Sequence, residues 1–113
     1  MDVVTGFLGV LRGGHTFSTG GSSSEEHWGD AHKLGDEVGI NNIETCTSYN
    51  AAKLARQAFS WTLDAAHLDF YERIKFSHLF GSMHPRLAGH VIYMLPTGGD
   101  DGRPDGEVGH EVE

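Results

Sequence analysis

The apolar residues near the start of the chain recur with the spacing of an amphipathic helix. Between residues 2 and 12 they lie three or four positions apart, at Val3, Val4, Phe7, Leu8 and Leu11. That spacing places them on one face of a helix with 3.6 residues per turn. Asp2 precedes them and is a suitable N-cap. The pattern therefore predicts a short helix over residues 2–12.

Two longer helices are predicted in the middle of the chain, at residues 47–63 and 66–83. The first carries an apolar stripe expected to be buried, at Ala51, Leu54, Ala55, Ala58, Phe59 and Thr62, and Trp61 is also expected in the core. The second ends before Pro85, which cannot continue a helix. Because the connection is only a short turn at residues 64–66, the two helices are predicted to be antiparallel neighbours.

The remaining segments lack sustained periodicity. Residues 13–43 are rich in glycine and contain three consecutive serines, Ser22 to Ser24. A loop of this length inside a compact domain is often functional, although a flexible connector is the plainer interpretation. Residues 97–113 combine glycines with acidic side chains, and this composition predicts a disordered tail.

The only cysteine, Cys46, stands two positions after a carboxylate, Glu44. In an extended segment, residues i and i+2 point to the same side, so both could reach one ion; inside a helix they could not. Thr47 or Ser48 can cap the following helix, which would leave residues 44–46 as an extended lead-in. A thiolate and a carboxylate suit zinc, which usually takes four ligands. The plainer interpretation is a buried cysteine beside a glutamate that compensates the helix dipole.

A third acidic residue, Glu72, lies within the 66–83 helix. Apolar residues occupy positions i−4, i+4 and i+7 from it, at Leu68, Phe76 and Leu79. This spacing predicts that Glu72 lies on the apolar face, where a carboxylate has to be paired or has a raised pKa, as active-site acids do. A structural ion pair with Arg56 or Arg73 is the alternative.

Several motifs, taken in order, resemble glycoside hydrolase family 127, the beta-L-arabinofuranosidase family. The sequence Glu-Thr-Cys-Thr-Ser-Tyr-Asn at 44–50 and the helix after it resemble the family's signature helix. Four further stretches resemble that family: the Gly-Gly loop at 19–21, Glu-His-Trp at 26–28, Tyr-Glu-Arg at 71–73 and the strand at 89–96. The resemblance spans residues 13 to 96.

The resemblance implies a mainly α fold, as a fragment of an (α/α)6-barrel catalytic domain centred on the helical hairpin. It also implies a retaining exo-glycosidase that acts on non-reducing-end arabinofuranosyl residues of glycans. Glu44 and Cys46 match two zinc ligands, and the family's other two ligands are cysteines, one of which is the nucleophile. Glu26 matches the general acid/base.

By the same resemblance, four residues are expected to contact the sugar. His27 and Trp28 follow the matched glutamate, Glu72 belongs to the Glu-Arg motif, and Tyr93 lies in the matched strand. Trp28 has the flat apolar face on which a sugar ring can stack.

Composition limits this picture further. The chain has 113 residues, a net charge of −8 and one cysteine. Because the second cysteine of the implied site is missing, we expect residues 1–96 to be a partial catalytic domain that is inactive alone. The negative charge without a basic stripe argues against nucleic acid and anionic membranes as partners. The partner that the resemblance implies is a carbohydrate substrate. No apolar run approaches a membrane span, and Asp2 makes a poor secretory signal, which favours a cytoplasmic location.

Two other functions fit the sequence. In the first, the chain is a non-catalytic module in which Glu44 and Cys46 bind zinc together with ligands from another chain. In the second, it is a small helical interaction domain unrelated to the family.

Overall fold

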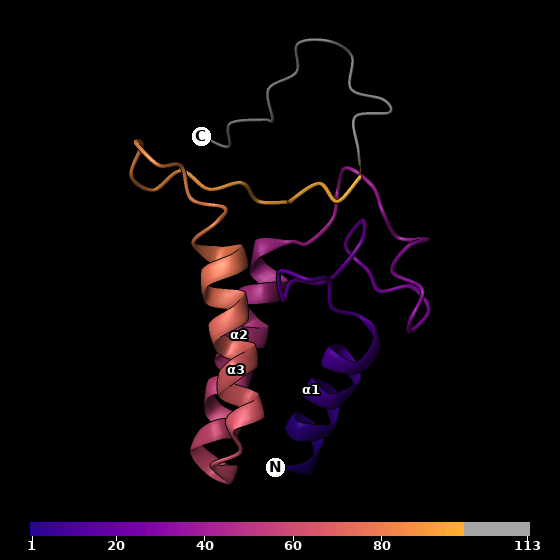
Figure 1. The fold of residues 1–113 in the computed structure, drawn as a ribbon, viewed down its shortest axis with the longest axis vertical. Coiled ribbons are helices and arrows are strands. Elements are labelled where there is room, and N and C mark those ends of the chain that lie inside the picture. The colour runs from indigo at the N-terminus through magenta and orange to yellow at the C-terminus, as the bar shows by residue number, and fades with distance from the viewer. Residues whose placement is uncertain (99–113) are drawn as a thin grey trace.

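The structure is a computed structural model that describes residues 1–98. It contains the helices α1 (Asp2–Gly14), α2 (Thr45–Thr62) and α3 (Ala65–Arg73), and α3 continues into a π-helical segment, η1 (Ile74–Leu79) (Figure 1). Across these 98 residues, β pairing is limited to isolated bridges. The predicted mainly helical fold is therefore confirmed.

The predicted tail begins at residue 97, and only its first two residues lie within the described part. The Thr97 and Gly98 backbone N–H groups both donate to the Gly39 carbonyl, at 2.9 and 3.0 Å. These two residues are thus held against the Gly-rich loop. The prediction of disorder for the rest of the tail lies outside the described residues.

The first predicted helix is confirmed and runs two residues further, to Gly14. Met1 is its N-cap, and Asp2 lies in the first turn instead of capping it. Leu8 and Leu11 are its buried apolar residues, and they pack toward α2.

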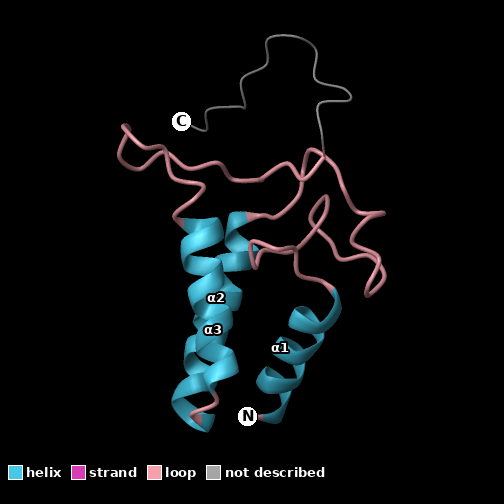
Figure 2. Cartoon of the chain, in the orientation of Figure 1, coloured by secondary structure: helices cyan, strands magenta, loops and turns pink. Residues whose placement is uncertain are grey.

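The predicted helical hairpin is also confirmed, because α2 and α3 lie side by side with opposite chain directions (Figures 1 and 2). Leu63 ends α2 in the left-handed conformation, with φ 56°. Asp64 then caps α3: its Oδ1 accepts a hydrogen bond from the Ala66 N–H at 2.9 Å. A left-handed residue followed at once by an N-cap reverses the chain within two positions.

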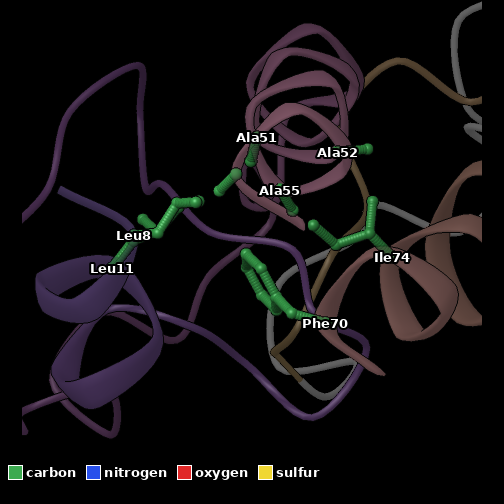
Figure 3. Packing of buried hydrophobic residues seen from close by; sticks show 8 residues of the cluster. Leu8, Leu11, Ala51, Ala52, Ala55, Phe70 and Ile74 are labelled. Carbon is green, nitrogen blue, oxygen red and sulfur yellow. The ribbon is translucent and has the colours of Figure 1, made fainter. Parts of the chain in front are cut away.

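The core lies where α1 and α3 meet the alanine face of α2. Figure 3 shows Phe70 and Ile74 directed toward Ala55, with the α1 leucines on the other side. The buried alanines of α2 are Ala51, Ala52, Ala55 and Ala58. Small side chains on α2 allow both neighbouring helices to approach closely, since every larger side chain would need additional space.

Two α2 residues that were expected to be buried are exposed. Thr62 is exposed, and Trp61, expected in the core, is 48% exposed. Both stand in the last turn of α2, directly before the chain reversal that leads into α3.

The predicted position of Glu72 on the apolar face is wrong, because Glu72 is exposed. The buried face of α3 and η1 is formed instead by His67, Phe70, Ile74 and His78. The Phe80 N–H donates to the Lys75 carbonyl at 2.9 Å, five residues back, which is the hydrogen bond of a π-helix. The buried positions 67, 70, 74 and 78 still recur every three or four residues, and the stripe predicted through Leu68, Glu72 and Phe76 lies on the opposite, exposed face of this helix.

No helix within residues 1–98 is long and apolar enough to cross a membrane.

Candidate active site

The Glu44 carboxylate and the Cys46 thiol lie in direct contact at the start of α2. The Cys46 Sγ donates a hydrogen bond to Glu44 Oε1 at 2.6 Å. Glu44 is the N-cap, with extended backbone angles of −65° and 131°, and Cys46 lies in the first helical turn, where it is exposed. An extended cap followed by a first-turn residue thus brings the two side chains to the same side, although this contact was predicted for an extended segment that includes both residues.

The expected cap of α2 is corrected by the structure. The helix begins at Thr45, so neither Thr47 nor Ser48 is the cap, and Cys46 does not lie in an extended lead-in. The Ser48 N–H donates to the Glu44 carbonyl at 3.2 Å, and this bond closes the first turn. The Glu44 side chain does not cap the helix, because it is directed to Cys46.

Tyr93 joins this pair from a segment nearly fifty residues away. Its hydroxyl donates a hydrogen bond to Glu44 Oε1, the same oxygen that accepts the thiol. The Cys46 thiol and then the Glu44 carboxylate, as hydrogen-bonding neighbours of the neutral phenol, raise the pKa of Tyr93 above its ordinary value of 10. Tyr93 was expected to contact the sugar; in this structure its hydroxyl is committed to Glu44.

Thr45 attaches the Tyr93 segment to the start of α2. Its N–H donates to the Tyr93 carbonyl at 2.8 Å, and its hydroxyl lies 2.9 Å from the carbonyl oxygens of both Ile92 and Tyr93. Glu44 and Met94 also form an isolated β-bridge. Thr45, the middle residue of the Glu-x-Cys motif, was not predicted to have a role; only its position between two predicted ligands could have drawn attention to it.

The Gly-rich loop returns alongside the segment that leads into α2. The Ile43 N–H donates to the Ser23 carbonyl at 3.0 Å, and the Glu25 N–H donates to the Asn41 carbonyl at 2.9 Å. The Glu44 N–H in turn donates to Ser23 Oγ at 3.2 Å. The loop that carries the matched glutamate, Glu26, is therefore fixed beside the Glu44–Cys46 pair.

Glu26 itself lies at the tip of a tight turn. Ser24 and His27 exchange two backbone hydrogen bonds, of 2.8 and 3.0 Å, across Glu25 and Glu26. Both central residues have positive φ, at 45° and 69°. This is the geometry of a two-residue type I′ turn, which usually contains Asn or Gly, and non-glycine residues in such conformations are concentrated at functional sites. The Glu26 side chain is exposed.

Two glycines allow the loop to lie directly on the helical hairpin. Gly20 has φ 86°, which side chains rarely adopt. A Cβ atom on Gly21 would collide with Ile43, and it would lie 2.9 Å from His78 Nδ1 and 3.1 Å from Ser48 Oγ. The Gly-Gly motif is thus required because the loop packs directly against α2 and η1.

Beneath these glycines, His78 and Ser48 form a buried hydrogen bond of 2.7 Å between Nδ1 and Oγ. Burial lowers the pKa of His78 from its ordinary value of 6.5, because the charged imidazolium is poorly solvated there. His78 was not singled out among the eight histidines of the chain, since it has no spacing that would distinguish it.

The other predicted site residues are not brought into contact with the Glu44–Cys46 pair. His27 Nδ1 lies 2.9 Å from the Glu25 carbonyl oxygen, to which it can donate. Trp28 packs edge-on against Phe7 and lines a shallow pocket under the turn together with His27. Glu72 lies exposed on α3. The roles proposed for His27, Trp28 and Glu72 remain predictions.

The described residues supply two donors toward a metal ion and no more. Glu44 Oε1 and Cys46 Sγ lie close enough to bind one ion, and their carboxylate and thiol chemistry fits zinc. Within residues 1–98, however, no group of three or more His, Cys, Asp or Glu side chains is arranged to hold a metal. The pair therefore fits half of a zinc coordination shell.

These features describe an exposed group of a carboxylate, a thiol and a phenol at one end of a helical hairpin. Beside it lies the Gly-rich loop, whose tight turn carries the carboxylates of Glu25 and Glu26. Comparison with known families identifies the class: the beta-L-arabinofuranosidase catalytic domain of glycoside hydrolase family 127 matches residues 1–110. The chain belongs to this family, whose members are glycoside hydrolases, and the family resemblance inferred from the motifs is confirmed. No curated protein sequence matches the chain.

Proposed function

We propose that this chain forms the central part of the catalytic domain of a retaining beta-L-arabinofuranosidase. Its substrates would be glycans with arabinofuranosyl residues at their non-reducing ends. The observation that carries the proposal is the 2.6 Å contact between Cys46 Sγ and Glu44 Oε1 at the start of α2. This contact lies beside the turn that presents Glu26.

Glu44 and Cys46 would hold zinc together with two cysteines that lie beyond these 113 residues. When bound, zinc would stabilise the thiolate form of its cysteine ligands, which supplies a nucleophile at neutral pH. One of the two further cysteines would attack the anomeric carbon.

Glu26 would act as general acid and then as general base. In the first step its carboxyl would donate a proton to the departing glycosidic oxygen, and in the second it would take one from the attacking water. The exposed turn leaves the carboxylate accessible to a substrate, and the hydrogen bonds across Ser24 and His27 fix its backbone.

The surface of the hairpin supports a larger helical assembly of the (α/α)6-barrel type. Large apolar side chains are exposed along α2, α3 and η1, at Trp61, Leu63, Leu68, Phe76 and Phe80. Large exposed apolar side chains along two neighbouring helices are typical of a contact face. In a closed barrel, neighbouring helix pairs would cover it.

The proposal predicts that the isolated chain binds zinc but does not hydrolyse aryl arabinofuranosides. Zinc content would be measured for the purified chain and for Cys46→Ser, with Ser77→Ala on the exposed side of η1 as the matched control. An equal zinc content in the wild-type chain and in Cys46→Ser would contradict a metal site at Glu44 and Cys46. Reading the DNA after residue 113 in all frames for a cysteine pair tests whether the chain is part of a larger enzyme.

The role of Glu26 can be tested in a complete catalytic domain that contains this segment. The test measures how the effect of Glu26→Gln on kcat/KM depends on the leaving group of the substrate. Glu26→Gln should reduce kcat/KM by about 10²- to 10⁴-fold for substrates with poor leaving groups, which need the proton. Aryl substrates with acidic leaving groups should lose much less. Glu25→Gln, in the same turn, is the control. A uniform loss for all leaving groups would exclude the role of general acid.

A second candidate is a non-catalytic module that shares a metal ion with another chain. The observation in its favour is that Cys46 is exposed, so a partner could contribute the missing ligands. Zinc-dependent dimerisation in sedimentation experiments, abolished by Cys46→Ser, would support this function over the first.

A further inference from the structure

Two hydrogen-bond donors converge on one oxygen of Glu44. Cys46 Sγ donates to Oε1 from the first turn of α2, and the Tyr93 hydroxyl donates to the same atom from the opposite segment. Among the described residues, the other oxygen, Oε2, has no side-chain hydrogen bond. The carboxylate is thus held in one orientation by two groups, and only one of these is a candidate metal ligand.

The position of Tyr93 is fixed independently of Glu44. The Ile92 N–H donates to the Ser82 carbonyl at 2.8 Å, which attaches the segment to the turn after η1. Thr45 binds the Ile92 and Tyr93 carbonyls from the start of α2. Because the backbone is held on both sides, the phenol is presented to Glu44 with only two side-chain torsions free.

The two donors differ in what becomes of them when a metal binds. A ligating cysteine is a thiolate, so Cys46 would no longer donate to Glu44, and two negative groups would then face each other. The Tyr93 hydroxyl is not a candidate ligand, and its segment is attached through Ser82 and Thr45, so its contact with Glu44 does not depend on the Cys46 thiol. It can therefore hold the Glu44 carboxylate in place when the bond from the thiol is lost.

We propose that Tyr93 is a positioning residue, which orients Glu44 as a metal ligand and does not itself bind the metal or the sugar. This inference rests on the proposed function, because it requires Glu44 and Cys46 to share a cation. Hydrogen bonds from such outer groups fix the orientation of ligating carboxylates, and their loss typically lowers metal affinity about 10- to 100-fold.

The first test is a titration of the chain with Co²⁺, in which the thiolate-to-cobalt absorption band reports on Cys46. Tyr93→Phe should weaken Co²⁺ binding about 10- to 100-fold. Tyr49→Phe, an exposed tyrosine on α2 that packs against Lys53, is the matched control and should bind as the wild type does. Circular dichroism would establish that each variant keeps its helices.

A double-mutant cycle separates positioning from a general structural effect. In a Glu44→Ala background, Tyr93→Phe should have no further effect on Co²⁺ affinity, because the residue through which it acts is absent. The same loss in both backgrounds, or no loss in either, would overturn the inference.

A measurement without metal distinguishes failure of this inference from failure of the proposed function. Side-chain coupling constants of Glu44 from NMR should show one rotamer in the wild type and averaging in Tyr93→Phe. One outcome is that the Glu44 rotamers are averaged in Tyr93→Phe, while Cys46→Ser binds Co²⁺ as the wild type does. In that case the proposed metal site is wrong and the orienting role of Tyr93 stands. If Glu44 keeps one rotamer in Tyr93→Phe, the orienting role is overturned whatever the metal data show.

Discussion

At the scale of single residues, the glycine pair of the loop has the clearest physical requirement. Gly21 lies so close to Ile43, His78 and Ser48 that a Cβ atom has no space. The contact joins the loop that carries Glu26 to the two helical elements beneath it. In the sequence, the Gly-Gly motif only indicated a family. The structure adds its physical reason, which is that the loop packs against the helices with no space for a side chain.

Gly21→Ala should destabilise the chain by about 1–3 kcal/mol, because the added methyl group overpacks a closed interface. The measurement is the free energy of unfolding from urea titration. Gly9→Ala is the control: nothing lies within 4 Å of a Cβ atom there, and Gly9 is in the interior of α1. Alanine at that position should stabilise by about 0.5–1 kcal/mol. Equal effects of the two substitutions would contradict the packing explanation.

At the scale of elements, the π-helical segment η1 continues the buried face that α3 begins. It places Ile74 and His78 on the buried side and leaves Phe76 exposed. The His78–Ser48 hydrogen bond then joins η1 to the first turns of α2. A buried neutral histidine in this contact makes the packing of the hairpin sensitive to pH.

Stability should fall as the pH drops below about 6.5, the ordinary pKa of histidine. Burial lowers the pKa of His78 in the folded chain, so between the two pKa values the unfolded chain binds more protons. The contribution of His78 is therefore complete above the unfolded pKa and is lost on acidification. Urea unfolding at about pH 7.5 and pH 5.5 measures it.

The matched comparison uses two histidine variants. His78→Gln should reduce the difference in unfolding free energy between the two pH values, since the titrating group is gone. His90→Gln, at an exposed position, should leave that difference unchanged. A wild-type pH dependence retained in His78→Gln would assign the effect to other groups.

At the scale of the whole molecule, the candidate site is assembled from three distant stretches of chain. The Gly-rich loop, the start of α2 and the segment around Tyr93 meet at one end of the hairpin (Figure 1). Thr45 is the residue through which the last of these is attached. The site therefore depends on contacts that close long loops and not on any single motif.

Thr45→Val should loosen the attachment of the Tyr93 segment while leaving the helices formed. Valine keeps the shape of threonine but removes its hydroxyl, so the expected cost is about 0.5–1.5 kcal/mol. Hydrogen exchange would be measured at the Ile92 amide, which should exchange faster than in the wild type. Thr5→Val in α1 is the control. Comparable exchange at the Ile92 amide in the wild type, Thr45→Val and Thr5→Val would show that the Thr45 hydroxyl does not hold this segment.

The sequence by itself determined the helices, their antiparallel pairing and the family. Helical periodicity, Pro85 and the short connection at residues 64–66 are local signals, and local signals suffice where neighbouring elements pack directly. The contact between Glu44 and Cys46 could be predicted for the same reason, since the two residues are only two positions apart.

Only the tertiary structure decided which face of the α3–η1 helix is buried and which groups surround the site. Glu72 was misplaced because two faces of this helix carry apolar residues, and the sequence spacing fits Leu68 and Phe76 as well as it fits Phe70 and Ile74. Tyr93 and Ser23 reach Glu44 through contacts across 49 and 21 residues. Such contacts depend on how the loops close around the hairpin, and spacing along the chain carries no information about them.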